Sequence, residues 1–482
     1  MAEPRTESAR LPASVWKITA VAVLGSLLAQ IDATVVNVSL SSLATELHSS
    51  LAVIQWVTSG YLFALALVLP LNAWLVHRIG AKSLYLWCFS AFTICSALCG
   101  LAWSANALIF FRILQGMSGG LLAPMAQLMM ARAGGKHMAR LMGYAALPIL
   151  AGPILGPILA GLILQHASWR WLFLVNLPVG LLAIVLCLLF LPNDRAETTP
   201  RAFDFLGFAL LAPGLVLFLY GADHVREHLG VDCLGIAAVF LILFVITARR
   251  KGDRALVNLG LFKRRVFPVS AITQFLQNGI VFASQMLIPF FLIRACGRTP
   301  SATGWLLAPL GVGMLCIYPS LGALTQRFGI RRIAVAGALL SLMSTVPFLY
   351  LTTHGLLIVL LELALFLRGI GQGAIGIPSV TAAYASVRAQ ELPMAATTLN
   401  IAQRLGGPTL TTICATFLAW RMNATSSSPT LMNAFTAAFV LLCGLHISLL
   451  LVALRLPVSV ETAAERCDEG QATVARPISV DS

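Results

Sequence analysis

Charged residues are scarce in this sequence. Asp, Glu, Lys and Arg occupy 10% of its 482 positions, whereas about a quarter is usual in soluble domains. Hydrophobic residues reach 59%, and the mean hydropathy is +0.88. This composition excludes an ordinary soluble domain. It predicts an all-α integral membrane protein, because a helix satisfies its own backbone hydrogen bonds within lipid.

The sequence also lacks the residue spacings of common catalytic sites. Its ten cysteines show no paired metal-ligand spacing, and most lie in apolar runs, where they are expected to pack as small hydrophobic residues. It contains no nucleotide-binding loop and no separate catalytic domain. We therefore expect that the protein is not an enzyme and has no metal site and no cofactor. We also expect that a proton gradient, and not ATP, is its energy source. The first apolar segment has no convincing cleavage site and is expected to remain as a membrane span.

Fourteen segments are apolar over about the 20 residues that a helix needs to cross a bilayer. They cover residues 17–38, 53–76, 82–103, 107–131, 140–165, 171–191, 204–222, 232–248, 267–293, 302–325, 330–351, 355–380, 395–419 and 430–454. The sequence therefore predicts fourteen transmembrane helices.

The net charge of +14 comes from basic residues scattered among short loops, a pattern that does not predict nucleic-acid binding. We place the N-terminus in the cytoplasm and count residues at span ends with the adjoining loop. Cytoplasmic segments then hold 24 of the 32 Lys and Arg, external loops hold 5 and spans hold 3. The positive-inside rule therefore predicts cytoplasmic N- and C-termini. The basic connection at 249–265 is read as a topology determinant, with contact to anionic lipid headgroups as the alternative.

An internal repeat divides the chain. The segment AWLVHRIGAKS at 73–83 recurs as GALTQRFGIRR at 322–332, an offset of 249 that also relates the first and ninth spans. This predicts two pseudo-symmetric six-helix bundles with two extra central spans, and such bundles enclose a substrate path near the membrane midplane. The expected divisions are a cytoplasmic segment at 1–16, bundles at 17–191 and 267–454, a linker at 192–266 with inserted spans at 204–222 and 232–248, and a disordered cytoplasmic tail at 455–482.

Several motifs occur in order along the chain. They are LAQIDATVVNVSL at 28–40, the loop at 77–82, FRILQGMSGGLLAP at 111–124, the glycine and proline run ALPILAGPILGPILAG at 146–161, WRWLFLVNLPVG at 169–180 and NIAQRLGG at 400–407. Together they resemble the fourteen-span drug/proton antiporter branch of the major facilitator superfamily. The resemblance implies multidrug efflux in exchange for protons. The sequence departs from the family pattern at Ala73, His77 and Ala160, where glycine, an acidic residue and glycine are common.

Ionisable residues inside spans are costly and usually functional. Two carboxylates lie well inside spans, Asp32 and Glu362, together with the arginines Arg112, Arg368 and Arg404. The depths of Asp32 and Arg112 are compatible, so we expect them to interact, directly or through water. Our hypothesis is that Asp32 carries the coupling proton, and the alternative is that the two residues form a permanent helix clamp.

Glu362 has three interpretations. It could pair with an arginine, meet a cationic substrate, or reach water at the external surface. Polar stripes on otherwise apolar helices supply further candidates for substrate contact or coupling, with interhelical hydrogen bonding as the alternative. The candidates are Gln30, Thr34, Asn37, Gln115, Gln274, Asn278, Gln285, Glu362, Arg368, Asn400 and Arg404. Asp32 lies about 200° around the helix from Gln30, so the acid and the first stripe must face different neighbours.

Two further sets of residues are expected to shape the conformational change. The gating loops are expected to hold adjacent spans at the cytoplasmic face through glycine turns and basic side chains, and they contain His77, Arg78, Gly80, Lys82, Arg327, Gly329, Arg331 and Arg332. Close helix packing is expected from glycines, with the prolines bending the helix, at Gly116, Gly119, Gly120, Gly152, Pro153, Gly156, Pro157 and Gly161.

The leading function is therefore secondary active export of amphipathic or drug-like small molecules in exchange for protons, by alternating access. A dedicated exporter of one metabolite, lipid or peptide-like product is the second interpretation, and a transport-dead membrane sensor is the third. The expected partners are the substrate, protons and the lipid bilayer, with a periplasmic adaptor left open. The expected location is the cell inner (plasma) membrane.

Overall fold

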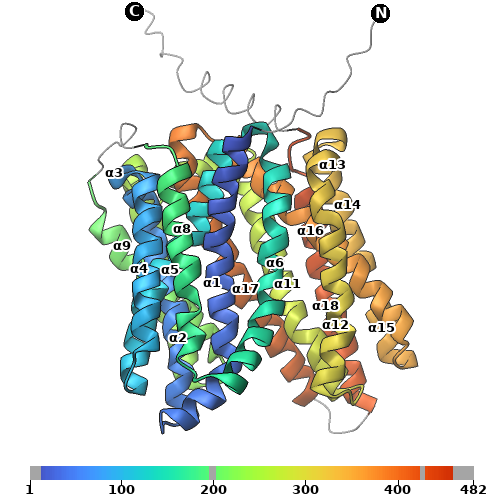
Figure 1. Cartoon of the computed structure of the whole chain (residues 1–482). Coiled ribbons are helices and arrows are strands. Elements are labelled where there is room, and N and C mark those ends of the chain that lie inside the picture. Colours follow the sequence, from blue (N-terminus) through green and yellow to red (C-terminus); the bar gives the residue numbers. More distant parts are fainter. Residues whose placement is uncertain (1–11, 195–201, 424–428, 460–482) are drawn as a thin grey trace, which may run out of the picture.

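A computed structural model describes residues 12–194, 202–423 and 429–459. Within these ranges the regular structure is helical, without β-strands. The helices stand side by side, and the described chain starts and finishes at the same end of the molecule, which we call the terminal end (Figure 1). Parts of the expected terminal segments, linker and C-terminal bundle lie outside the described residues, at 1–11, 195–201, 424–428 and 460–482.

The first group of helices extends over the N-terminal part of the chain. It comprises α1 (Ala13–Glu46), α2 (Leu51–Val68), η1 (Leu69–Leu71), α3 (Asn72–Ile79), α4 (Ala81–Gly100), α5 (Ala105–Gly134), η2 (Gly135–His137), α6 (Met138–His166), α7 (Trp171–Leu174) and α8 (Asn176–Phe190). Its helices are joined by contacts of α1 with α5, α6 and α8, and of α2 and α4 with α5. We call this group the N-half.

The second group begins after two helices of the middle region. That region contains α9 (Phe205–Asp223), α10 (His228–Lys251), η4 (Gly252–Arg254) and η5 (Leu259–Lys263). The second group, here called the C-half, comprises α11 (Phe267–Arg294), α12 (Pro300–Ile317), η6 (Tyr318–Ser320), α13 (Leu321–Phe328), α14 (Ile330–Met343), α15 (Val346–His354), α16 (Ile358–Ala385), η7 (Ala389–Glu391), α17 (Leu392–Asn423) and α18 (Pro429–Ala453). Because α9 packs on α10, α2 and α17, this middle pair lies beside both halves.

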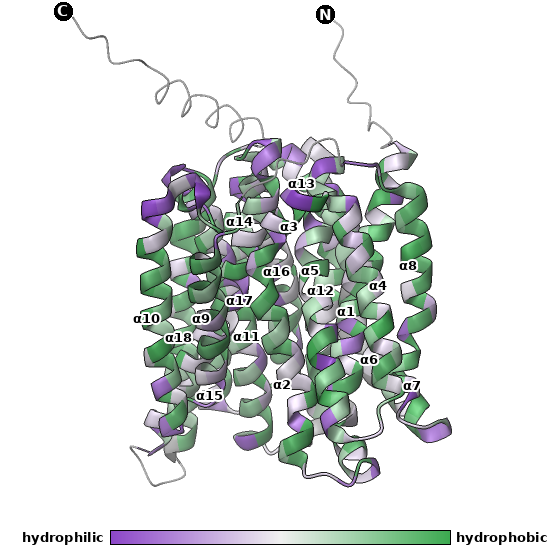
Figure 2. Cartoon of the chain, turned by 90° about the vertical axis from the view of Figure 1, so that its left-hand side faces the viewer, coloured by the Kyte–Doolittle hydropathy of each residue, from purple (hydrophilic) through white to green (hydrophobic). Residues whose placement is uncertain are grey.

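Twelve segments of the described residues are long and apolar enough to cross a membrane by length and composition. Two further long helices, α6 and α17, lie outside those twelve and pack against α1 and α11. Apolar residues cover the sides of the molecule between hydrophilic ends (Figure 2). Each segment expected to be a span consists mainly of helix, and some are divided, as 330–351 is between α14 and α15. The first helix, α1, runs from Ala13 to Glu46, beyond the expected limits of 17–38. The protein is therefore a helical, multi-pass membrane protein.

The internal repeat has a matching geometry in both halves. Pro70 lies in the short 3-10 helix η1 between α2 and α3, and Pro319 lies in η6 between α12 and α13. Gly80 then joins α3 to α4 with φ of 82°, and Gly329 joins α13 to α14 with φ of 85°. Left-handed φ values favour glycine because it has no Cβ. The offset of 249 read from the sequence therefore relates two bends and two tight helix junctions.

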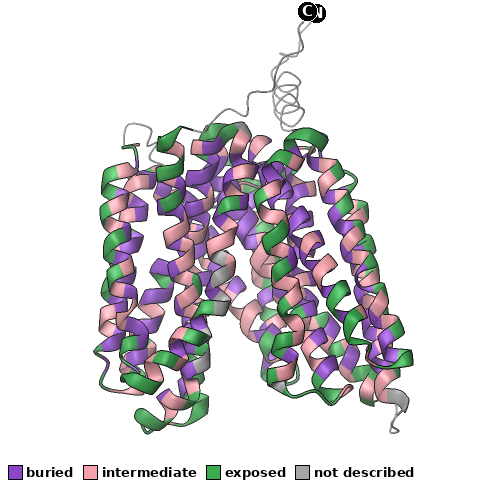
Figure 3. Ribbon diagram, turned by 45° about the vertical axis from the view of Figure 1, so that its right-hand side comes forward, coloured by how far each residue is buried: buried purple, intermediate pink, exposed green. Residues whose placement is uncertain are grey.

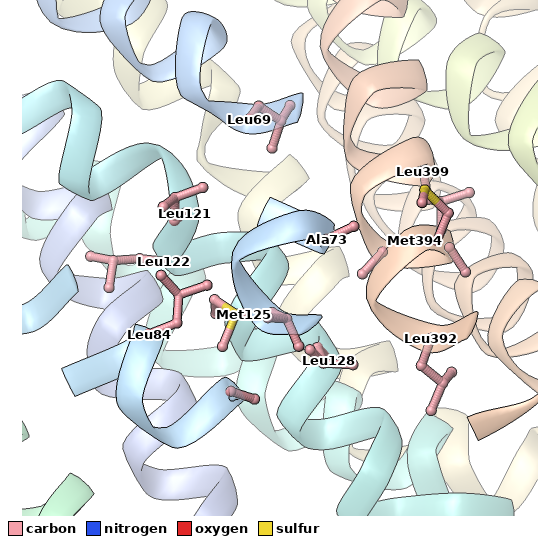
Figure 4. Close-up of a cluster of buried hydrophobic side chains, with 14 of the residues drawn as sticks. Leu69, Ala73, Leu84, Leu121, Leu122, Met125, Leu128, Leu392, Met394 and Leu399 are labelled. Carbon is pink, nitrogen blue, oxygen red and sulfur yellow. The ribbon is translucent and has the colours of Figure 1, made fainter. Parts of the chain in front are cut away.

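Hydrophobic packing joins the halves near the terminal end. Leu69 and Ala73 of the N-half belong to the same buried cluster as Leu392, Met394 and Leu399 of α17, and Figure 4 shows these side chains from the two sides approaching each other. The helices lie close together at the terminal end and diverge toward the opposite end (Figure 3).

Candidate coupling and transport site

The carboxylate of Asp32 lies inside the N-half and accepts three hydrogen bonds. Arg112 Nη1 donates to Oδ2 over 2.6 Å, while Asn176 Nδ2 and Gln115 Nε2 donate to Oδ1 over 2.8 and 3.1 Å. The donors come from α5 and α8, and α1 supplies the acid. Asp32 is 1% exposed, and Arg112 and Gln115 are fully buried. Three helices thus converge on one carboxylate that is sheltered from solvent.

Arg112 is held on its other sides by a backbone carbonyl and two aromatic rings. Its Nε donates to the carbonyl oxygen of Val57 over 3.2 Å. The guanidinium carbon lies 4.2 Å from the ring centre of Tyr61 and 5.7 Å from that of Phe173. A cation over an aromatic face is stabilised by the ring quadrupole. These contacts orient the arginine toward Asp32, and the direct contact expected between these residues is present.

Glycines in α5 allow α2 to come close enough for this arrangement. A Cβ on Gly116 would lie 2.4 Å from the Tyr61 carbonyl oxygen, and one on Gly120 would lie 2.6 Å from that of Leu65. A Cβ on Gly119 would meet the Tyr61 hydroxyl at 2.8 Å. Because backbone atoms cannot yield cheaply, Gly116 and Gly120 tolerate only glycine at this helix separation. The close crossing places the Tyr61 ring over Arg112.

The glycine and proline run in α6 packs against α1, on the side away from the carboxylate. A Cβ on Gly152 would lie 3.0 Å from Gln30 Cβ, and one on Gly156 would lie 2.7 Å from Thr34 Cβ. Gly161 does not take part, because a Cβ there would meet nothing within 4 Å. It lies about 140° around the helix from Gly156, so the expectation of close packing at Gly161 is corrected. The side chains of Pro153 and Pro157 lie outside the described part of the chain.

The polar stripe of α1 faces differently from Asp32, as the 200° separation predicts. Gln30 and Asn37 are exposed, and Thr34 is half-buried. The Thr34 hydroxyl donates within its own helix to the Gln30 carbonyl over 2.8 Å and also reaches the Gly152 carbonyl at 3.4 Å. Gln115, which the sequence grouped with the stripes, belongs instead to the Asp32 network.

The stripe of α11 divides into a buried and an exposed part. Gln274 donates to the Gly376 carbonyl over 2.7 Å and to the Ser379 hydroxyl, and it accepts from Gln403 over 2.7 Å. This is interhelical hydrogen bonding. Asn278 is half-buried and Gln285 is exposed.

The charged candidates of the C-half are not brought together. Glu362 is exposed near the start of α16, whereas Arg368, on the same helix, is fully buried. Arg404 of α17 lies near enough to the Tyr61 phenol of the N-half to interact with it electrostatically. None of the ion pairs found in residues 12–194, 202–423 and 429–459 includes Glu362, Arg368 or Arg404.

Hydrogen bonds cross between the halves at the terminal end. Asn72 Nδ2 donates to Thr397 Oγ1 over 3.1 Å, and both residues are fully buried. Gln127 Oε1 accepts from the Tyr384 hydroxyl over 2.8 Å and from Asn400 Nδ2 over 3.0 Å. Asn400 thus joins the two halves, as the alternative interpretation of interhelical hydrogen bonding predicts.

The predicted gating loops lie at the same end. Lys82 Nζ donates to the carbonyls of Leu191 and Leu188 over 2.6 and 3.1 Å, and Arg331 Nε donates to that of Leu456 over 2.6 Å. In both cases a basic residue fastens a repeated loop to the end of its own half. His77 is half-buried, and the other basic side chains of the loops, Arg78, Arg327 and Arg332, are exposed.

Asp194 lies far from the first loop in the sequence but supplies that loop with an acid. Its carboxylate accepts from the backbone N–H groups of Ala81 and Lys82 over 2.7 and 3.2 Å and from Arg132 Nη1 over 2.8 Å. Anions are stabilised at helix N-termini, here that of α4. A carboxylate from beyond α8 therefore holds the first loop at the start of α4.

Three further residues of the site escaped the sequence reasoning. Asn176 donates to Asp32 and to Ser96 Oγ, which lies 3.1 Å away, and Ser96 in turn donates to the Phe173 carbonyl over 2.9 Å. Asn176 stands out as a lone amide in the apolar run FLVNLP, which is a signal that could have been used. Ser96 and Tyr61 carry no such signal, since small hydroxyls and aromatics are common in packed spans.

Comparisons with known proteins agree with this architecture. Residues 22–410 match the Major Facilitator Superfamily. The multidrug resistance protein B homolog of Mycobacterium tuberculosis is 31% identical over 424 residues, covering 86% of this chain and 78% of that protein. MdtD of Escherichia coli, whose name marks its multidrug-resistance role as provisional, is 32% identical over 365 residues, covering 73% of this chain and 75% of that protein.

Two solved structures share the fold at low sequence identity. A double-tryptophan variant of XylE aligns with a TM-score of 0.66 and 15% identity, covering 95% of this chain and all of that chain. The human organic anion transporter MFSD10 aligns with a TM-score of 0.62 and 18% identity, covering 92% of this chain and all of that chain. These likenesses establish the arrangement of helices.

Proposed function

The chain belongs to the major facilitator superfamily, and we propose that within it the protein exports amphipathic or drug-like small molecules in exchange for protons. Membership makes it a transporter of small molecules and not an enzyme. The direction of transport, the proton coupling and the substrate class are the parts that we propose. The names of the M. tuberculosis and E. coli relatives support drug efflux.

The observation that carries the proposal is the buried ion pair of Asp32 and Arg112. A carboxylate sheltered in a membrane bundle changes protonation when its surroundings change, because desolvation favours the neutral acid and a nearby arginine favours the anion. In the described conformation the carboxylate accepts hydrogen bonds from three donors. A movement that separates α1 from α5 or α8 would remove donors and favour protonation.

One proton crossing the membrane supplies enough free energy for export. At a potential of 100 mV, it contributes about 2.3 kcal/mol, which corresponds to a substrate concentration ratio of about 50. The proposal therefore needs no cofactor beyond the proton gradient, and it uses Asp32 and Arg112 as the coupling residues.

The arrangement of helices supports alternating access. We propose that α6 and α17 also span the membrane, which gives fourteen spans, and that the chain divides at 17–191, 192–266 and 267–454. The bias of Lys and Arg favours a cytoplasmic terminal end. Polar contacts such as Asn72 with Thr397 hold the halves together there, so the described conformation would open to the outside. We place the protein in the plasma membrane.

The test begins with accumulation of fluorescent amphipathic compounds in cells that lack or overproduce the protein. The panel contains cationic, neutral and carboxylate-bearing members. The compound most depleted by overproduction is then measured in proteoliposomes of the purified full-length protein. Proton-driven flux that a protonophore abolishes supports coupled export. Flux that ignores the protonophore contradicts proton coupling, and the absence of flux for every compound contradicts export of this substrate class.

A further inference from the structure

The C-half contains a buried arginine that has no acid among its described neighbours. Arg368 of α16 is fully buried, and its guanidinium reaches only hydroxyl groups: Nη2 donates to Ser284 over 2.5 Å, and Nη1 lies 3.5 Å from Thr345 Oγ1. Its Nε has no hydrogen-bond partner in the part of the chain that the structure describes. From α18, Cys443 and His446 are close enough to interact with it electrostatically. At neutral pH neither of these residues normally carries a negative charge.

The contrast with the N-half is direct. The first and fourth membrane-crossing helices of the N-half are α1 and α5, where Arg112 meets Asp32. The equivalent helices of the C-half are α11 and α16, where Arg368 meets Ser284. An uncompensated charge is costly in a membrane interior. A negatively charged group beside Arg368 would therefore stabilise this buried arginine.

A cavity adjoins this guanidinium. It has a volume of about 80 Å³, and its lining includes Ser284, Gln285, Arg368 and Gln372 together with apolar side chains such as Leu365. The Gln372 side chain is 5% exposed, and its Oε1 has no hydrogen-bond partner. One buried water needs about 10–15 Å³ of such volume, so the cavity admits a small anionic group. Gln285 is exposed, so the lining reaches the surface of the C-half.

We propose that the Arg368 cavity binds a monovalent anionic group, supplied either by the carboxylate of a transported molecule or by a chloride ion. The anion would take the unused donor of Arg368 and provide the negative charge that Asp32 provides in the N-half. This deepens the proposed function by adding an anionic group to the substrate class, and it rests on that function only in treating the cavity as part of the transport path.

The test uses the purified full-length protein in detergent, with sodium benzoate, sodium chloride and neutral benzamide as probes. Ionic strength is held constant with HEPES, which serves as the reference anion. The thermal unfolding midpoint is followed during each titration, and binding of radiolabelled benzoate is measured by equilibrium dialysis. We expect a saturable rise in the midpoint with benzoate and none with benzamide. A saturable rise with chloride alone assigns the group to an inorganic anion, whereas no rise with either anion overturns the proposal.

Three variants tie the response to this site. Arg368→Gln should weaken anion binding by about tenfold or more, because a charge-assisted hydrogen bond is lost. Arg294→Gln, at the end of α11, should bind anions as the wild type does. If Arg368→Gln fails to fold, Ser284→Asp replaces it: an internal carboxylate should raise the midpoint without any anion and abolish the response to benzoate and chloride. Ser284→Asn is its uncharged control and should keep the response.

Wild-type binding in Arg368→Gln, or a full anion response in Ser284→Asp, would overturn the proposal. These measurements need no proton gradient. A negative result here therefore leaves coupling at Asp32 untouched, and failure of proton-driven flux leaves the anion site untouched.

Discussion

Asp32 on α1 and Arg112 on α5 form an ion pair in which neither side chain is exposed. Gln115 joins both members, since its Nε2 donates to Asp32 while its Oε1 accepts from Arg112 over 2.8 Å. The pair is therefore one part of a network that fixes the relative position of three helices. A change in the protonation of the carboxylate would be felt by all three.

The first prediction concerns the stability of this network. Asp32→Asn should lower the free energy of unfolding by about 3–5 kcal/mol, because it leaves the buried Arg112 without its counter-charge. Removing both charges in Asp32→Asn/Arg112→Gln should recover part of that loss. Thermal unfolding of the purified variants measures both effects, with the exposed Asp223→Asn as the control. A loss in the double variant equal to the sum of the losses in Asp32→Asn and Arg112→Gln would show that the pair has no electrostatic coupling.

The second prediction concerns the crossing of α6 over α1. Gly156→Val should abolish transport, because its Cβ would lie 2.7 Å from Thr34 Cβ. The matched control is Gly161→Val on the same helix, where a Cβ meets nothing within 4 Å and transport should persist. The measurement is export by cells that carry each variant at equal membrane expression. Similar activity in both variants would contradict a tight crossing at Gly156.

The third prediction concerns the closed terminal end. Asn72→Cys and Thr397→Cys, combined in a background without native cysteines, should form a disulfide, because the native side chains touch over 3.1 Å. Oxidation should stop transport, and reduction should restore it, since alternating access requires the halves to separate there. Each single cysteine variant serves as the control for oxidation itself. Full transport by the cross-linked protein would mean that this contact never opens.

The fourth prediction concerns pH and Asp204, which caps α9 just before the membrane-crossing segment Phe205–Asp223. Burial favours a raised pKa for the Asp204 carboxyl, but hydrogen bonds from Lys251 Nζ and from the backbone N–H groups of Gly207 and Leu256 outweigh it and hold this pKa below its ordinary value. A lowered folded-state pKa stabilises the fold above the unfolded-state pKa of about 3.9 and loses that contribution as the pH falls through the folded-state value.

Asp204→Asn should therefore reduce stability at pH 7 by about 1 kcal/mol, because Asn keeps the acceptor that caps the Gly207 N–H but loses the negative charge that faces Lys251. The gap between wild type and variant should shrink as the pH falls below about 4. Thermal unfolding across a pH series checks this, and the exposed Asp232→Asn serves as the reference. A gap that grows on acidification would show that the ionised Asp204 carboxylate does not stabilise the fold.

The sequence predicted the helices well because apolar length is a local property. Each expected apolar segment consists mainly of helix, and the two repeated glycines join helices as their motif indicates. The contact of Asp32 with Arg112 was also predictable, since two opposite charges at compatible depth in lipid have few other partners. The rotation of α1 followed from helical geometry, which separates Asp32 from Gln30.

The rest depends on packing that no local pattern encodes. Asp194 reaches the N-terminus of α4 across a long sequence distance, and Asn176 completes the carboxylate site from α8. Gln274 and Asn400 are polar residues of the kind that contact substrates, but they form hydrogen bonds with neighbouring helices. Whether a polar stripe meets another helix or an open path depends on helix rotation within the bundle, which follows from the packing of all helices together.

The central claim is that Asp32 carries the coupling proton. The most direct test measures transport of the compound selected by the accumulation panel in proteoliposomes with an imposed pH gradient, comparing wild type with Asp32→Asn/Arg112→Gln, which keeps the site uncharged. The account predicts that the gradient accelerates wild-type transport, whereas the variant moves substrate only down its own concentration gradient at a rate that ignores pH. Acceleration of the variant by the pH gradient, to the same extent as the wild type, would contradict it.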